Sequence, residues 1–266
     1  MTGDAPVRRA PDPNDWDYHW DEIGEASERS PANDYRHALI LKLLGRPTAG
    51  STVLDIGSGQ GQFALRLQTL YPDVAVWGVD SSARGVARSR ELAAQGDSGA
   101  KFRQVDLLQP TALADGQPLA TYAVCSEVLE HVADPVTLIR NARTLLAPGC
   151  HLVVTTPGGP RSAWERHIGH FQHFTGRKLS QVLTDAGYEV QRVLRAGFPF
   201  FNLYQLAKVV RGKKLIADLE HRATGEVPAE SILKALFGFG LRHSLDNAPL
   251  GWQMIVVASV PMQDAS

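Results

Sequence analysis

Between Thr52 and Val193 the chain alternates short apolar runs with segments of helical periodicity. Apolar runs of this length, bounded by polar or glycine-containing turns, predict buried β-strands. They lie near Val53–Ile56, Ala75–Val79, Lys101–Val105, Tyr122–Ser126, His151–Thr156 and Glu189–Leu194. Helices are predicted between them, near Gln62–Leu70, Ser82–Ala94, Asp134–Leu145 and Gly176–Ala186, with exits at Pro148-Gly149 and Ala186-Gly187. This alternation predicts a parallel sheet covered by helices on both faces.

The N-terminal flank differs from this alternating centre. Residues 1–14 are rich in Pro and Asp without apolar periodicity, so they are predicted to form a flexible tail. Residues 15–46 predict a helical cap, because Tyr35 and Leu39 follow helical spacing. The aromatic cluster around Trp16 is interpreted as core packing, with closure over a ligand as the alternative.

The C-terminal flank predicts one more strand and an insert. The strand is the apolar run Trp252–Val260, and residues 198–250 before it are too many for an ordinary connection. This insert is Phe-rich, then basic, then apolar again near Ile232–Phe237, the basic residues being Lys208, Arg211, Lys213 and Lys214. We interpret it as a helical pair on the sheet edge or a substrate lid, with a membrane-binding surface as the alternative. Residues 15–266 are then a single domain.

Composition narrows the function classes. With 27 basic and 28 acidic residues the formal charge is −1, which argues against a nucleic-acid partner. Cys125 and Cys150 are the only cysteines, and the first residues lack the apolar run of a secretory peptide, so we expect a cytoplasmic protein. No apolar stretch approaches the roughly 20 residues that cross a bilayer.

The strongest chemical signal is the sequence VLDIGSGQGQF, residues 53–63. A buried strand runs into Gly57, Gly59 and Gly61, and a helix opens directly afterwards, so a ligand can approach bare backbone. A dinucleotide fingerprint would place its third glycine at Gln62 and would not usually put an acid at Asp55. The spacing therefore disfavours a nicotinamide cofactor.

Two more acids follow at the ends of the next predicted strands. Asp80 ends WGVD, about 20 residues beyond the turn, where a carboxylate can accept both ribose hydroxyls of an adenosine. Asp106 closes the third strand in FRQVDLL. Each acid taken singly could instead cap the following helix. Together they converge on the crevice where open α/β sheets bind ligands.

The turn, an acid followed by three alternating glycines, resembles the first motif of class I S-adenosylmethionine-dependent methyltransferases. The stretch YAVCSEVLEHVADPVTLIRNARTLLAPGCHLVVTTP, residues 122–157, is similar to the fourth and fifth motifs of small-molecule methyltransferases that include quinone O-methyltransferases. The resemblance implies an α/β, Rossmann-like doubly wound sheet of seven strands, mostly parallel with an antiparallel last strand. The N-terminal helical cap and the helical insert lie outside it.

The resemblance also implies the cofactor, S-adenosylmethionine, with S-adenosylhomocysteine as product. The first motif would cradle its methionine part, Asp80 its ribose and Asp106 its adenine amino group, with the Leu107 backbone N–H on the ring. Arg36 could pair with the methionine carboxylate. The complete expected set is Asp55, Gly57, Ser58, Gly59, Gly61, Asp80, Ser81, Asp106, Leu107, Ser126 and Arg36.

Acids and histidines beyond the fourth strand are the catalytic candidates. An oxygen or nitrogen acceptor needs a base to take its proton, and His131, His173 and Glu127 are proposed for that task. Glu127 could share one helical face with Glu130 or His131. The motif RHIGHFQHFT adds His167 and His170.

A metal site is the less favoured reading of the same residues. Glu127, Glu130, His131 and His170 could hold Mg²⁺, Mn²⁺ or Zn²⁺, and the ExxEH spacing resembles the metal site of small-RNA 2′-O-methyltransferases. The alternative without a metal is that this segment only leads into a helix, with His170 and His173 hydrogen-bonded to the loop backbone and Glu130 exposed to solvent.

The favoured function is methylation of an O, N or C atom on a small-molecule metabolite or natural product. One alternative is a lipid or quinone acceptor reached by peripheral contact at a membrane surface. Another is a metal-dependent RNA 2′-O-methyltransferase, which the near-neutral charge disfavours.

Overall fold

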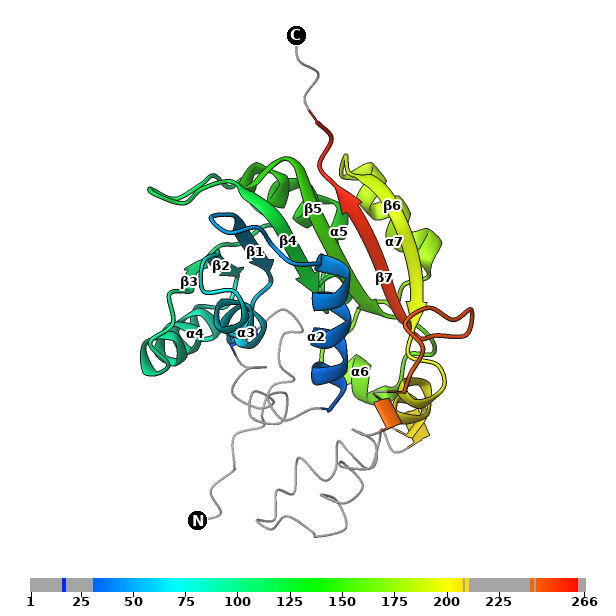
Figure 1. The fold of residues 1–266 in the computed structure, drawn as a ribbon. Coiled ribbons are helices and arrows are strands. Elements are labelled where there is room, and N and C mark those ends of the chain that lie inside the picture. Colours follow the sequence, from blue (N-terminus) through cyan, green and yellow to red (C-terminus); the bar gives the residue numbers. More distant parts are fainter. Residues whose placement is uncertain (1–15, 18–30, 208, 211–239, 242, 263–266) are drawn as a thin grey trace, which may run out of the picture.

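The fold is built on a seven-stranded sheet with the order β3-β2-β1-β4-β5-β7-β6 (Figure 1). The computed structural model describes residues 16–17, 31–207, 209–210, 240–241 and 243–262. The strands are β1 Thr52–Ile56, β2 Ala75–Asp80, β3 Lys101–Gln104, β4 Ala120–Ser126, β5 Leu146–Pro157, β6 Glu189–Ala196 and β7 Gln253–Ser259. The first five are parallel, and β7 runs antiparallel between β5 and β6. The predicted fold class is confirmed.

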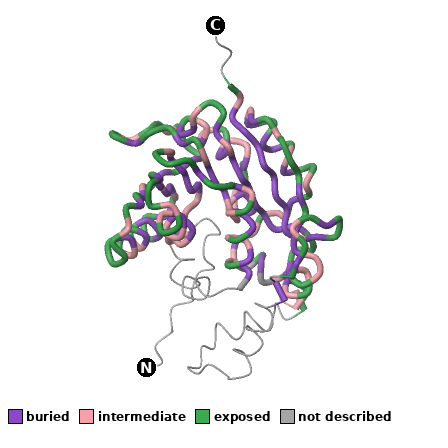
Figure 2. Tube along the Cα trace, in the orientation of Figure 1, coloured by how far each residue is buried: buried purple, intermediate pink, exposed green. Residues whose placement is uncertain are grey.

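Helices cover the two faces of this sheet (Figure 1). They are α2 Pro31–Leu44, α3 Gln62–Leu70, α4 Ala83–Gln95, α5 Pro135–Ala142, α6 Ala163–His167 and α7 Gly176–Asp185. Alternate strand residues enter different cores: Val53 packs with α2, α3 and α4, whereas Leu54 packs with α5 and α7. Because both faces are covered, the central strands are mostly apolar, and Figure 2 shows them buried.

The order of the strands predicts a ligand crevice between β1 and β4. The strand order reverses there, since β1 continues to β2 on one side while β4 continues to β5 on the other. In open α/β sheets, ligands bind at the carboxyl ends of the strands at such a switch point. The glycine turn after β1 and the acidic segment after β4 both lie at this edge.

Two predicted boundaries were wrong. Pro148-Gly149 is no helix exit, because β5 already begins at Leu146 and Gly149 lies inside it with φ +74°. The pairing with β4 shifts register at this point, which is a bulge that glycine accommodates. The preceding helix is also shorter than predicted: α5 ends at Ala142 and is followed by a 3₁₀ turn.

Helix α6 was not predicted, although its sequence carries a start signal. Ser162 and Glu165 bond reciprocally to each other's backbone N–H, which is a capping box. The five-residue helix is too short to show periodicity. Its capping box holds the segment that leads into the histidine motif.

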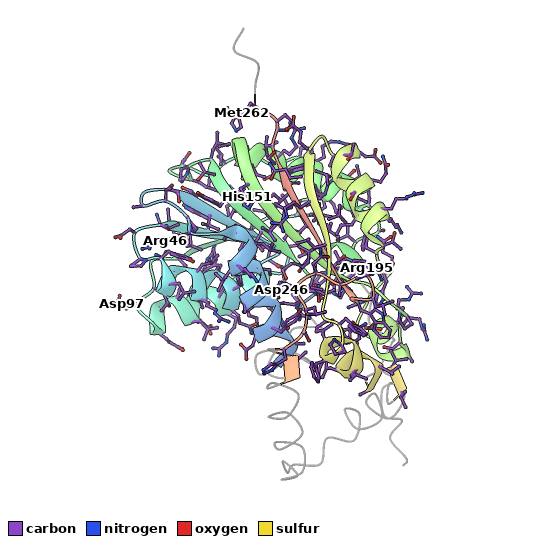
Figure 3. All side chains as sticks on the ribbon, turned by 45° about the vertical axis from the view of Figure 1, so that its right-hand side comes forward. Arg46, Asp97, His151, Arg195, Asp246 and Met262 are labelled. Carbon is purple, nitrogen blue, oxygen red and sulfur yellow. The ribbon has the colours of Figure 1, made fainter. Side chains whose placement is uncertain are left out.

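The cap and the insert meet beside the sheet. Lys42 of α2 forms an ion pair with Asp246, in the segment before β7. Figure 3 labels Asp246, which lies beside α2. The Tyr35 and Phe201 rings are in contact, with their centroids 5.5 Å apart. Residues 200–207 are helical, as the insert reading requires. The predicted tail, the basic patch and the apolar stretch Ile232–Phe237 lie outside the described residues, as do Tyr18, His19 and Trp20 of the aromatic cluster around Trp16.

Within the described ranges, no helix has both the length and the apolar character needed to cross a membrane.

Candidate active site

The glycine turn after β1 adopts a backbone that only glycine takes easily. Gly57, Gly59 and Gly61 have φ values of +72°, +52° and +81°. A Cβ on Gly57 would lie 2.3 Å from Val128 Cγ2, so a side chain there would collide with the segment after β4. The sequence prediction of a tight turn opening a helix is confirmed, with Gly61 as the N-cap of α3.

The turn also holds polar atoms that lack partners. The side-chain atoms Ser58 Oγ, Gln60 Oε1 and Gln62 Nε2 are shielded from solvent, and none has a hydrogen-bond partner within the described part of the chain. Burying a polar group without a partner costs roughly 1–3 kcal/mol each. Several in one turn indicate a place where a polar ligand supplies the missing bonds. The sequence motif did not point to Gln60 and Gln62, because both occupy positions between and after its glycines that the motif leaves unspecified.

Asp80, the last residue of β2, is fixed by two backbone donors. Its Oδ2 accepts from Gly59 N at 2.8 Å, and its Oδ1 accepts from Ser82 N at 2.8 Å. Burial raises the pKa of this carboxyl. A carboxylate has about four acceptor sites, so two remain for a ligand hydroxyl pair. Asp80 therefore joins the glycine turn to the start of α4, and its two remaining acceptor positions can take the hydroxyls of a ribose.

Asp55 is the next-to-last residue of β1 and lies beneath the turn, at the strand end that the sequence predicted. Its side chain is buried, and it accepts a bond from the backbone N–H of Ala64 in α3. Burial, together with the charge of Asp80, raises its pKa to about 7. A direct cofactor contact by Asp55 stays a prediction, because the observed bond is to the helix that follows the turn.

The raised pKa of Asp55 predicts a pH-dependent stability. Below its unfolded value of 3.8 the carboxyl is neutral in both states, and its full contribution to stability is present. As pH rises to about 7, the unfolded chain ionises first, so stability is lost across this window. We expect the unfolding free energy of the wild type to fall relative to Asp55→Asn by on the order of 4 kcal/mol. Urea unfolding between pH 4 and 8 measures it, with exposed Asp115→Asn as control. Parallel profiles for wild type and Asp55→Asn would contradict the raised pKa.

The segment after β3 is held by α5. Asp106 is exposed two residues beyond β3, and its Oδ1 accepts from Leu108 N at 2.9 Å. Asn141 of α5 donates from Nδ2 to the Leu107 carbonyl at 2.9 Å. Asn141 thereby fixes the backbone predicted to meet the adenine ring, a role that sequence analysis missed because it links residues 34 positions apart.

Trp16 and Asp17 touch both sides of the crevice. Asp17 accepts bonds from Ser82 Oγ and, at 3.1 Å, from Arg84 N at the start of α4. The Trp16 ring meets the His131 ring edge-on, with their centroids 4.6 Å apart. These consecutive residues therefore join the side of β2 to the side of β4. This geometry supports the alternative in which the aromatic segment closes over a ligand.

Glu127 is the centre of a bonded network at the end of β4. Its Oε1 accepts from Gln253 Nε2 at 2.7 Å and from Thr155 Oγ1 at 3.2 Å, while its Oε2 lies 3.5 Å from Arg36 Nη1. Ser126 Oγ in turn bonds to Thr155 Oγ1 at 2.9 Å. Arg36 is thus paired with a protein carboxylate, and its contact with a cofactor carboxylate stays a prediction.

The predicted shared helical face of Glu127 with Glu130 or His131 is wrong. Glu127 has φ +57°, a left-handed conformation that is rare outside glycine and is often found at functional sites. A 3₁₀ turn follows only at Leu129–His131. The backbone reversal sends the two carboxyls into different surroundings.

Glu130 is buried, so the reading of a solvated carboxyl is also wrong. Its residue is 1% exposed, and neither carboxyl oxygen has a hydrogen-bond partner within the described ranges. Burial, and then the charge of Glu127, raises the pKa of Glu130 well above its ordinary value. Its Oε1 lies 3.9 Å from His131 Nε2. The His131 and His170 ring centroids are 4.4 Å apart.

Glu130, His131 and His170 form a group with the composition of a metal site. One ligand atom from each lies within 4.8 Å of the other two. Glu127, the fourth residue of the predicted set, is occupied by Gln253, Thr155 and Arg36. Two imidazoles and one carboxylate, leaving an open position, are the protein ligands of several catalytic zinc sites.

The loop that carries His170 and His173 is anchored by backbone bonds. Phe171 N donates to the Glu130 carbonyl at 2.8 Å, and His170 N donates to the Glu165 carbonyl at 2.9 Å. The interpretation without a metal predicted that the His173 ring bonds to the loop backbone. This is confirmed, since its Nδ1 lies 3.0 Å from the Gly159 carbonyl oxygen. The His170 ring instead bonds to His173. The side chain of His167 lies outside the described part of the structure.

A family model described as a methyltransferase domain matches residues 28–193. The ubiquinone biosynthesis O-methyltransferase of Albidiferax ferrireducens is 35% identical over 131 residues, covering 49% of this chain and 50% of the relative. The same-named protein of Alkalilimnicola ehrlichii is 29% identical over 138 residues, covering 52% and 53%. The chain therefore spans about half the length of these curated relatives.

Solved structures with the same fold are more distant in sequence. Phosphoethanolamine N-methyltransferase 2 of Haemonchus contortus, in complex with S-adenosyl-L-methionine, has a TM-score of 0.58 at 18% identity, covering 86% of this chain and 52% of that one. A geranyl diphosphate methyltransferase in complex with GPP and sinefungin has a TM-score of 0.56 at 18% identity, covering 85% and 78%. At this identity the likeness shows the fold alone.

Proposed function

The chain belongs to the methyltransferase domain family, and we propose that it transfers a methyl group from S-adenosylmethionine to an oxygen atom of a small-molecule acceptor. The observation that carries the proposal is the glycine turn itself. It combines three positive-φ glycines with the Gly59–Asp80 bond at the switch point. Buried polar atoms on Ser58, Gln60 and Gln62 add to this, since they have no hydrogen-bond partner among the described residues.

The residues present fit this cofactor. Asp80 would accept the ribose hydroxyls next to Ser81, and the segment Asp106–Leu107 would meet the adenine. The glycine turn would carry the methionine part, and Ser126 and Arg36 would lie at its far end. When bound, the cofactor supplies a methyl group already activated by the sulfonium. The chain's own task is to align the reactants and exclude water, to which Trp16 and Asp17 contribute by bridging the crevice.

An oxygen acceptor is supported by two observations. The curated relatives carry the name of an O-methyltransferase. Imidazoles also gather beside the crevice, where His131 contacts both Trp16 and His170. An acceptor hydroxyl must lose a proton during transfer, and we assign His131 as the group that takes it. Glu127, held by three partners, serves to orient Arg36 and the end of β4.

The setting we propose is the cytoplasm, since both Cys125 and Cys150 are buried free thiols. The near-neutral charge disfavours an RNA acceptor. A membrane lipid or quinone acceptor is the alternative, and the insert at residues 198–250 would then supply the membrane contact.

Calorimetric titration with S-adenosylhomocysteine tests the cofactor assignment, with NADH as the control ligand. We expect stoichiometric binding of S-adenosylhomocysteine with a dissociation constant on the order of 1–10 μM, which corresponds to about 7–8 kcal/mol. Uptake of NADH in its place would overturn the proposal. Transfer of a labelled methyl group to a panel of phenols and catechols then tests the acceptor class.

We propose, as a second feature, a divalent cation held by Glu130, His131 and His170. The observation that favours it is the buried Glu130 carboxyl, whose two oxygens lack partners in the described part of the chain. A cation there would supply the missing contacts and lower the pKa of a nearby acceptor hydroxyl. A ligating imidazole nitrogen has no lone pair left for a proton, so with the cation bound His131 would be a ligand, and the base role assigned above belongs to the enzyme without the cation. This set replaces the earlier four-residue hypothesis, since Glu127 is already bonded.

A further inference from the structure

His173 links a backbone carbonyl to a residue of the proposed cation site. Its Nδ1 lies 3.0 Å from the Gly159 carbonyl oxygen, and its Nε2 lies 3.3 Å from His170 Nδ1. Both ring nitrogens are therefore engaged, which leaves His173 poorly placed to act as the base suggested by the sequence. The arrangement instead constrains where the protons sit on both rings.

The Gly159 carbonyl determines which nitrogen of each ring is the hydrogen-bond donor. A carbonyl oxygen only accepts, so His173 Nδ1 must carry the proton. In the neutral ring Nε2 then holds the lone pair, and it accepts from His170. His170 must consequently carry its own proton on Nδ1, which leaves the lone pair on His170 Nε2.

A nearby carboxylate does not reverse this order. Glu165 Oε2 lies 3.8 Å from His173 Nε2, beyond hydrogen-bond distance, and the same oxygen already accepts from Ser162 N. Placing the proton on Nε2 would instead set two lone pairs against each other across the 3.0 Å contact with the Gly159 carbonyl. The shorter contact decides the tautomer.

The Gly159 carbonyl is itself held in place. Gly159 has φ +74°, and a Cβ there would lie 2.7 Å from the Trp252 ring. The preceding residue, Gly158, donates from N to the Trp252 carbonyl at 2.6 Å. The strand end of β5 and the start of β7 therefore fix the first acceptor of the chain of bonds.

We propose that His173 is a positioning residue, which holds His170 in the Nδ1–H tautomer so that His170 Nε2 is a ligand for a divalent cation shared with Glu130 and His131. The inference rests on the cation site proposed above. Hydrogen bonds of this kind from the second nitrogen of a ligating histidine orient the ring and raise metal affinity by about 10-fold to 100-fold. A carbonyl–His173–His170 relay would perform this function without a carboxylate.

Long-range ¹H–¹⁵N spectra of the metal-free protein, treated with chelator, test the tautomer directly. We expect the Nδ1–H form for both His170 and His173, although the Nε2–H form is the commoner one for free histidine. This readout needs neither a methyl donor nor an acceptor. An Nε2–H form at His170 would overturn the proposal whether or not the protein is a methyltransferase.

A matched pair of variants tests the consequence. In His173→Gln the amide oxygen reaches the Nε2 position and can still accept from His170, whereas in His173→Asn it does not. We expect Zn²⁺ or Mn²⁺, titrated alone, to bind His173→Asn about 10-fold to 100-fold more weakly than wild type, and His173→Gln to be close to wild type. S-adenosylhomocysteine affinity should be unchanged in both. Equal cation affinity in the two variants, or no cation uptake by the wild type, would overturn the inference while leaving the cofactor assignment intact.

Discussion

The Asp80→Asn protein is expected to bind S-adenosylhomocysteine about 100-fold more weakly than the wild type, because two charge-assisted bonds to the ribose are replaced by weaker ones. The asparagine amide also presents N–H groups where Gly59 N and Ser82 N now donate to a carboxylate. One of these two turn contacts must be lost. The variant therefore weakens both the ribose contact and the turn that carries the methionine part.

The same titration with Asp115→Asn supplies the control, because Asp115 is exposed and lies in the loop before β4, at the opposite edge of the parallel sheet from the glycine turn. Thermal unfolding of Asp80→Asn separates loss of binding from loss of fold. A folded variant with unchanged affinity would show that the acid at the end of β2 does not meet the ligand. The assignment of the whole crevice to an adenosine would then fail.

The Glu130→Gln protein is expected to lose cation binding by a factor of about 100 or more, since the substitution removes the anionic ligand of the site and leaves the size of the side chain unchanged. A neutral amide also suits the buried position, whose carboxyl oxygens now lack partners in the described ranges. The fold should therefore persist. Calorimetric titration with Zn²⁺ measures the loss, and S-adenosylhomocysteine affinity should not change.

Glu127→Gln is the matched comparison for this prediction. The Glu127 carboxyl is occupied by Gln253, Thr155 and Arg36, so its loss should weaken the cation only a few-fold, through the missing nearby charge, by roughly 1 kcal/mol. The reverse ranking, with Glu127→Gln abolishing binding and Glu130→Gln retaining it, would return Glu127 to the ligand set. It would also contradict the division of tasks between the two carboxyls.

That division depends on one backbone feature. The left-handed conformation of Glu127 ends β4 abruptly and turns its carboxyl toward β5, β7 and α2. Glu130 follows in a 3₁₀ turn and is buried beside the imidazoles. A strained residue at the carboxyl end of a central strand is a common device for directing a side chain into a site.

Local sequence pattern predicted the strands and most of the helices of this protein, and the antiparallel last strand followed from the family resemblance. The spacing of apolar positions located every strand of the sheet. Continuous apolar segments mark the central strands, which are buried on both faces, whereas the edge strands β3 and β6 are only partly buried. The alternating glycines located the turn after β1, since residues other than glycine rarely adopt the positive φ values found at Gly57, Gly59 and Gly61. The position of Asp80 at the end of β2 could also be predicted, because it follows from the order of the elements along the chain.

The tertiary structure decided which side chains meet. Gln253 reaches Glu127 from 126 positions away, and no local pattern carries such a contact. The different surroundings of Glu127 and Glu130 could not be predicted either. Helical spacing would have placed both side chains on one face, whereas the φ of +57° at Glu127 directs them apart. The bonds of His173 were equally hidden, since the Gly159 carbonyl that fixes its proton is presented by a turn packed on Trp252. Periodicity records which residues are buried, whereas the partner of a buried polar group is set by how distant strands and loops pack together.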